Sequence, residues 1–150
     1  MAITMQGNWT VQVKSKAAAF QQRFIIQGSS NGKDGVYNGV TSTSPVRVDG
    51  AQWTIQIQHK PSGKGTSWQP SAMRLGTPVR SGGQIALDVF SNDSGGDSDY
   101  NDLVLTCGMT ENASEYVVYG KVRSYHGLCG FNPCFPWFVV DTWAQLKTLL

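Results

Sequence analysis

Hydrophobic and polar residues alternate at period two in several short stretches of the chain. The alternation is clearest over Trp9–Val13, Trp53–Ile57 and Ile85–Val89, and it returns at Tyr116–Tyr119. Successive side chains of an extended strand point to opposite faces, so this period predicts half-buried strands in an antiparallel sheet. Turn-rich stretches separate them: Gly28–Gly35, Pro61–Gly65 and Ser81–Gly83. The pattern predicts an all-β fold, an antiparallel β-sandwich.

Two segments depart from this alternation. Lys14–Gln22 is interpreted as a loop or bulged strand that leads into Arg23–Gln27. After about residue 111 the character changes, and an apolar, proline-punctuated loop precedes Asp141, which predicts the cap of a short helix over residues 141–150. We therefore expect a sandwich over residues 1–123 and a C-terminal appendage over residues 124–150, packed on the sandwich or on a partner.

Composition supports the predicted β-fold and disfavours several classes of function. The chain has 150 residues, 17 of them glycine, with only 15% charged residues and a net charge of +2. Lys and Arg are scattered, which disfavours nucleic acid as a partner, and no segment approaches the roughly 20 apolar residues of a membrane span. Met1–Asn8 has neither the basic start nor the apolar run of a signal peptide, so the sequence leaves localisation open.

Acidic residues gather in one short segment. Five of the ten carboxylates lie within fifteen positions: Asp88, Asp93, Asp97, Asp99 and Asp102. Two unit charges about 4 Å apart repel by about 4 kcal/mol at an effective dielectric near 20. A folded chain that holds four such groups in one loop therefore indicates a cation between them. The alternative is a solvated acidic turn without metal.

The spacing and the donor atoms favour calcium. Asp97, Asp99 and Asn101 occupy every second position, which directs their side chains to one side of an extended chain. Asp102 follows at the entrance of a strand, and Gly95-Gly96 permits the tight path that brings Asp93 back. All these donors are oxygens, the ligands that calcium prefers, and the spacing differs from that of an EF-hand.

This string of residues resembles a known family. Asp97-x-Asp99-Tyr100-Asn101-Asp102, followed by Leu103-Val104-Leu105, is similar to the loop of the bacterial calcium-mediated lectins that bind fucose and mannose. The resemblance covers about Gln84–Leu105. It implies a β-sandwich that binds glycans through calcium, with sugar hydroxyls completing the shell, and it implies a homo-oligomer. The implied calcium ligands are Asp93, Asp97, Asp99, Asn101 and Asp102.

The resemblance has limits within the chain. Arg23-Phe24 followed by Asn31 is similar to the N-terminal ligand segment of that family, but Gly32 departs from it. Lectins of this kind end soon after the calcium loop and donate a C-terminal carboxylate to a partner subunit, whereas this chain continues from Asp102 to Leu150. Similar strings also occur in calcium-dependent carbohydrate-binding modules and in adhesins.

Aromatic residues provide further candidates for sugar binding. Trp9 and Trp53 lie on alternating strands, where a core position is the simpler interpretation, whereas Trp68 lies in a loop and is the better stacking surface. Ser94, inside the acidic loop, and Asn31 are the other sugar-binding candidates. His126, Cys129 and Cys134 allow an incomplete zinc pattern, a disulfide or buried thiols, and Cys107 stands apart from them.

No catalytic motif is present: the sequence lacks a nucleophile elbow, a phosphate loop and a zinc-protease helix. We therefore expect a non-enzymatic protein. The first hypothesis is a calcium-dependent lectin. The alternative is a structural calcium site in a targeting or adhesion domain of a larger toxin or adhesin. Coordination positions open to solvent would distinguish the first from the second.

Overall fold

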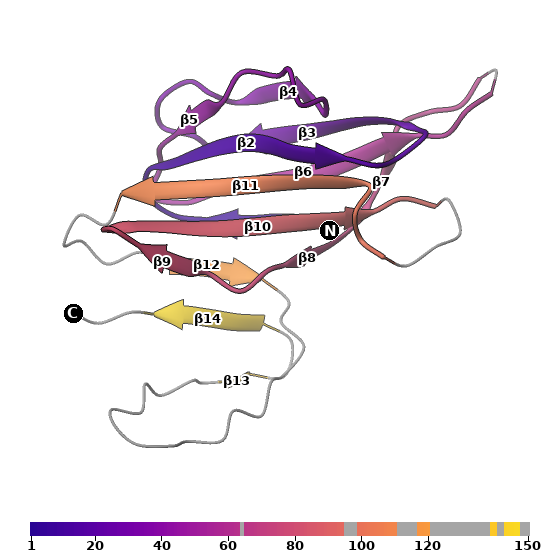
Figure 1. Cartoon of the computed structure of the whole chain (residues 1–150). Coiled ribbons are helices and arrows are strands. Elements are labelled where there is room, and N and C mark those ends of the chain that lie inside the picture. Colours follow the sequence, from indigo (N-terminus) through magenta and orange to yellow (C-terminus); the bar gives the residue numbers. More distant parts are fainter. Residues whose placement is uncertain (64, 95–98, 111–116, 121–138, 141–142, 148–150) are drawn as a thin grey trace.

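The computed structural model describes residues 1–63, 65–94, 99–110, 117–120, 139–140 and 143–147 (Figure 1). In these ranges the chain forms two antiparallel sheets that lie face to face, and the predicted all-β sandwich is confirmed. Within them, no helix is both long and apolar enough to cross a membrane.

The larger sheet has eight strands in the order β13-β14-β12-β1-β6-β3-β4, with β7 paired to the end of β6. Its strands are β1 (Ile3–Met5), β3 (Gln21–Gln27), β4 (Gly35–Asn38), β6 (Trp53–Lys60), β7 (Gln69–Pro70), β12 (Val117–Gly120), β13 (Val139–Val140) and β14 (Trp143–Lys147).

The smaller sheet has six strands in the order β5-β2-β11-β10-β8, with β9 paired to β10. Its strands are β2 (Trp9–Lys16), β5 (Val46–Val48), β8 (Ala72–Leu75), β9 (Val79–Ser81), β10 (Gln84–Asn92) and β11 (Leu103–Thr110). The register between β2 and β11 shifts by one residue, since Val104 faces Ser15 and Leu105 faces Val13. This bulge lies in the segment for which the sequence predicted a loop or a bulged strand.

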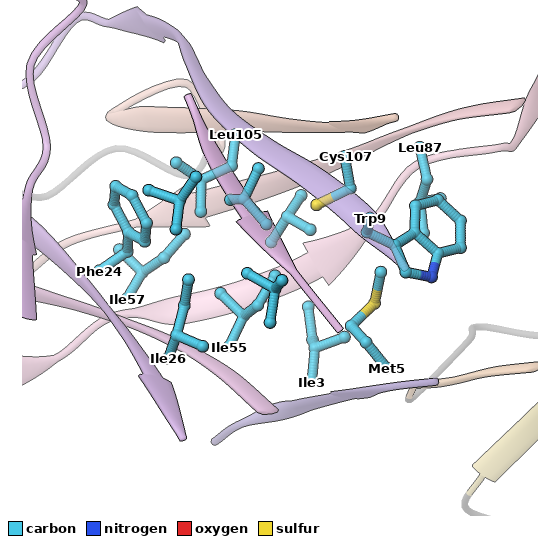
Figure 2. Packing of buried hydrophobic residues seen from close by; sticks show 14 of the residues in the cluster. Ile3, Met5, Trp9, Phe24, Ile26, Ile55, Ile57, Leu87, Leu105 and Cys107 are labelled. Carbon is cyan, nitrogen blue, oxygen red and sulfur yellow. The ribbon is translucent and has the colours of Figure 1, made fainter. Parts of the chain in front are cut away.

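The core lies between the sheets and follows the period-two pattern. Inward positions of β2, β6 and β10 are buried, while the residues between them are more exposed. Figure 2 shows side chains from both sheets meeting in one cluster. The largest fully buried members are Trp9, Trp53, Phe24, Ile3, Met5, Ile26, Ile55, Ile57, Ile85, Leu87, Leu103 and Leu105.

The two buried tryptophans also have their polar atoms satisfied. Trp9 Nε1 donates to the Gln6 carbonyl at 2.8 Å, and Trp53 Nε1 donates to the Gly7 carbonyl at 3.0 Å. A buried indole usually finds such a partner. Core packing, the simpler interpretation of Trp9 and Trp53, is therefore what the structure shows.

The C-terminal segment differs from its prediction. A helix was expected over residues 141–150, but Trp143–Lys147 forms strand β14, which pairs with β12 through Val118–Leu146 and neighbouring residues. β12 in turn pairs with β1. The edge of β12 presents unpaired backbone groups that residues 143–147 meet as a strand, and tertiary pairing of this kind overrides local helix periodicity.

The predicted boundary at residues 123 and 124 falls outside the described residues, so the division into sandwich and appendage stays a prediction. The zinc or disulfide candidates His126, Cys129 and Cys134 also lie outside them.

Cys107 is described and is a free, buried thiol. Burial, with a smaller contribution from Asp88, raises the pKa of Cys107 to about 12, which keeps this thiol protonated and unreactive at neutral pH.

Candidate functional site

The acidic loop lies at one end of the sandwich, between the adjacent strands β10 and β11 (Figure 1). The β2–β3 connection and the loop after β6 reach the same end, because Leu103 faces Lys16 in one sheet and Gln22 faces His59 in the other. Strand β7 joins them there through the pairing of Gln69 with His59. Two connections, β2–β3 and β6–β7, therefore lie at the same end of the sandwich as the acidic loop.

Asp93 and Asp102 close the base of this loop. The Asp93 backbone N–H donates to Asp102 Oδ2 at 2.7 Å. Asp102 is only 7% exposed, and its own carbonyl accepts hydrogen bonds from the backbone N–H groups of Ala17 at 3.1 Å and Ala18 at 3.3 Å. Asp102, predicted at the strand entrance, is therefore buried: the Asp93 backbone holds its side chain, and the β2–β3 connection holds its backbone carbonyl.

Asp99 and Asn101 form the outer part of the loop. Both are exposed, the Asn101 backbone N–H donates to Asp99 Oδ1 at 3.2 Å, and Asn101 Nδ2 donates to Asp99 Oδ2. The two side chains lie together, as their alternate spacing predicted. Asp97, the remaining predicted metal ligand, falls in residues 95–98, outside the described residues.

Tyr100 lies between these two residues and takes an unusual backbone conformation. Its φ is 60°, in the left-handed region that non-glycine residues seldom adopt. Its ring packs under the guanidinium of Arg74, which is 4.6 Å from the ring centroid and 5.2 Å from that of Phe90. Phe90 occupies an outward position of β10, so Tyr100 covers the outer face of the smaller sheet.

A cluster of polar side chains, three of them buried, lies on the inner side of the loop. Gln22 on β3 and His59 on β6 are cross-strand partners, and they are only 4% and 3% exposed. Gln22 Nε2 donates to Asp93 Oδ2 at 3.0 Å. The His59 ring nitrogens lie 3.0 Å from Ser71 Oγ and 3.1 Å from Ser94 Oγ. We call Gln22, His59, Ser71, Asp93 and Ser94 the inter-sheet polar cluster, because it joins the larger sheet to the end of β10.

Sequence reasoning missed Gln22 and His59, although a signal was present. Both occupy positions that face the core, because every second residue of these strands is buried: Gln22 lies two residues before Phe24, and His59 lies two residues after Ile57. A polar residue at an inward position must find a partner inside the fold, since a buried, unpaired polar group is costly. That rule marks both residues as members of an internal polar site.

The donor atoms at this end of the sandwich fit a calcium ion. They are carboxylate oxygens of Asp93, Asp99 and Asp102 together with amide oxygens, a set that matches the preference of calcium. In addition, Gln22 Oε1 is buried and has no hydrogen-bond partner among the described residues. The described residues contain no converging group of three His, Cys, Asp or Glu side chains, and Asp97 lies outside them. The calcium set therefore stays a prediction.

The predicted sugar-binding residues occupy different places. Ser94 lies in the loop and contacts His59, as described above. Trp68 is half-buried at the same end, with the guanidinium of Arg23 4.2 Å from its ring centroid. Asn31 lies in the turn after β3, at the opposite end, where Nδ2 donates to the Arg47 carbonyl at 2.9 Å and Oδ1 accepts from the Asp49 backbone at 3.2 Å. The structure therefore brings Ser94 and Trp68 to the loop end and leaves Asn31 away from it.

Gly39 controls the position of Gln22 and gives a first test of the site. Its N–H donates to the Gln22 carbonyl at 2.9 Å, and a Cβ at residue 39 would lie 2.8 Å from Gln22 backbone atoms. We expect Gly39→Ala to destabilise the fold by about 1–3 kcal/mol, as overpacking does. Urea unfolding measures this. Gly35→Ala is the control, since its Cβ would make an ordinary 3.7 Å contact with Tyr37, and an equal loss in both variants would contradict the tight approach.

Comparison with known proteins supports the fold. No family model matches the chain, and no curated protein matches it by sequence. Among solved structures, a lectin of Chromobacterium violaceum in complex with α-methyl-fucoside is 22% identical and superposes with a TM-score of 0.52, covering 72% of this chain and 94% of the lectin. The C-terminal domain of a Burkholderia cenocepacia lectin is 16% identical with a TM-score of 0.50, covering 73% and 96%. The chain therefore shares the fold of bacterial lectins, the fold that the acidic string had indicated.

Proposed function

We propose that this protein is a calcium-dependent lectin, which binds carbohydrate through a cation held by the acidic loop. The observation that carries the proposal is the position of an all-oxygen donor loop at one end of a sandwich whose fold is shared with bacterial lectins. One of those lectins is described in complex with α-methyl-fucoside. The proposal involves no catalytic step.

The geometry of the loop supports a divided role for its residues. Asp93 and Asp102 lie at its base, joined by a hydrogen bond and tied to both sheets. Asp99 and Asn101 lie at the exposed rim. A cation held between base and rim faces solvent on its outer side. Since calcium accepts about 6–8 oxygens with tolerant angles, two neighbouring sugar hydroxyls can complete its shell there.

Neighbouring groups then supply selectivity. Trp68 presents an aromatic ring at the same end, where it packs against Arg23, and an aromatic face suits the C–H face of a sugar ring. Ser94 offers a hydroxyl at the loop, held by His59. Together these residues offer a hydrogen-bonding group in the loop and an aromatic ring at the same end of the sandwich.

The direct test is a glycan panel probed with calcium and with a chelator. We expect binding of one or a few glycans in calcium and its complete loss in chelator, because the sugar contacts the protein largely through the ion. Restoring calcium should restore binding, whereas magnesium should restore it poorly because it prefers a tight octahedron and retains its water. Asn31→Ala serves as a control at the opposite end and should bind as the wild type does. Glycan binding that persists in chelator would contradict calcium dependence, and absence of glycan binding in all conditions would contradict the lectin proposal.

A further inference from the structure

The inter-sheet polar cluster contains one atom that its own hydrogen bonds do not satisfy. Gln22 lies between the sheets at 4% exposure, and its Nε2 donates to Asp93 Oδ2 at 3.0 Å. Its Oε1 has no hydrogen-bond partner among the described residues. Leaving a buried acceptor unpaired is unfavourable, and native proteins seldom do so without a reason such as strain, an ordered water or a bound ion. The two ends of the Gln22 amide therefore differ: Nε2 is paired with Asp93, while Oε1 is buried without a partner among the described residues.

The position of Gln22 is firmly set. Its backbone lies on β3, next to the edge strand β4, where it is paired on one side with His59 and contacted on the other by Gly39. On the Gly39 side the two backbones approach closely, because a Cβ at residue 39 would lie only 2.8 Å from Gln22. Gln22 therefore presents its amide to the base of the acidic loop from a rigid strand.

We propose that Gln22 is an additional ligand of the cation in the acidic loop, through Oε1. This inference rests on the proposed function, to which it adds an inner ligand contributed by the larger sheet. The predicted ligands all come from the β10–β11 loop of the smaller sheet. With Gln22 included, the cation site joins the two sheets.

The chemistry of the amide supports this assignment. Side-chain amide oxygens are ordinary calcium ligands alongside carboxylates. Oε1 and Nε2 belong to one planar group, and the terminal torsion of glutamine is broad and roughly two-fold. The amide can thus exchange its two ends beside Asp93 without movement of the strand. In the absence of a cation the N–H faces the carboxylate, and with a cation at Asp93 the oxygen is the favourable neighbour.

Two substitutions separate ligation from simple hydrogen bonding. Gln22→Glu keeps an oxygen ligand but removes the N–H donor, whereas Gln22→Leu removes both at similar volume. For each variant we would measure calcium affinity by titration calorimetry and the melting temperature in chelator. The luminescence lifetimes of bound Eu³⁺ in H₂O and D₂O would report the number of water molecules on the ion.

We expect Gln22→Glu to bind calcium at least as tightly as the wild type and to melt at a lower temperature in chelator, since its carboxylate would face Asp93. Gln22→Leu should bind calcium about ten-fold more weakly or worse, because loss of even an outer-shell partner has an effect of that size. Bound Eu³⁺ should carry an additional water molecule in Gln22→Leu. The matched controls Gln21→Glu and Gln21→Leu, at the exposed neighbouring position, should leave both affinity and hydration unchanged.

Two results would overturn the inference while leaving the proposed function intact. One is a loss of affinity in Gln22→Glu equal to that in Gln22→Leu, which would assign Gln22 a positioning role through its N–H group. The other is unchanged calcium affinity or Eu³⁺ hydration in Gln22→Leu. If Gln22→Glu fails to fold, Gln22→Asn replaces it: the shorter amide withdraws the oxygen, so wild-type affinity there counts against ligation. A wild-type protein that binds no calcium overturns the proposed function and this inference together.

Discussion

Asp99→Ala is expected to abolish stabilisation of the protein by calcium, while Asp88→Ala leaves it largely intact. Asp99 lies at the centre of the acidic string, in contact with Asn101 at the exposed rim of the loop. A ligand that binds only the native state adds about 2.7 kcal/mol to stability at one hundred times its Kd. Loss of a central carboxylate raises Kd until this contribution disappears at millimolar calcium.

Asp88 is the appropriate control because it is acidic and near in sequence but engaged elsewhere. Its Oδ2 lies 2.5 Å from Lys14 Nζ, in an ion pair on the outer side of the smaller sheet. Exposed pairs of this kind contribute about 1 kcal/mol or less, so Asp88→Ala should lower the melting temperature slightly and equally with and without calcium. Melting of wild type and both variants in calcium, in magnesium and in chelator makes the comparison. Equal loss of the calcium shift in both variants would mean that the site is misplaced.

Trp53→Ala is expected to lower the free energy of unfolding by about 3–5 kcal/mol, the cost of removing a large aromatic side chain from a packed core. Trp53 is 1% exposed, begins the central strand β6 and donates its indole N–H to the Gly7 carbonyl. The substitution leaves both a cavity and an unpaired carbonyl. A loss of this size is a large fraction of the stability of a typical domain.

Urea unfolding followed by tryptophan fluorescence and circular dichroism measures this loss. Val79→Ala is the control, since Val79 is 62% exposed and surface substitutions usually change stability by less than about 0.5 kcal/mol. A loss below about 1 kcal/mol in Trp53→Ala would contradict the position of Trp53 in the core.

The sandwich could be predicted because its strands carry a local signal. Burial on one face of β2, β6 and β10 requires apolar residues at every second position, and this period is visible in the sequence without knowledge of any partner strand. The C-terminal helix was predicted wrongly for the complementary reason. Residues 143–147 take their conformation from pairing with β12, and no local pattern reveals that an edge strand is available.

The candidate site could be predicted only where its residues are neighbours in sequence. Asp99 and Asn101 lie side by side because they are two residues apart in the sequence. Gln22 and Asp93 are in contact although they are 71 residues apart. Their contact depends on how the two sheets face each other, which alternation within each strand leaves undetermined. Asn31 shows the reverse case: its motif is similar to a ligand segment, and in the structure its amide joins the turn after β3 to residues 47–49, away from the loop.

The hydrogen bonds from Ala17 and Ala18 to the Asp102 carbonyl have a consequence for how the protein can diversify. They hold the base of the acidic loop through main-chain groups alone, and main-chain donors are retained by any residue other than proline. Ala17 and Ala19 are exposed beside the loop, so their side chains can be replaced without loosening the carboxylates. Mutation or library selection can therefore vary the side chains next to the acidic loop while the backbone hydrogen bonds that hold the loop are kept.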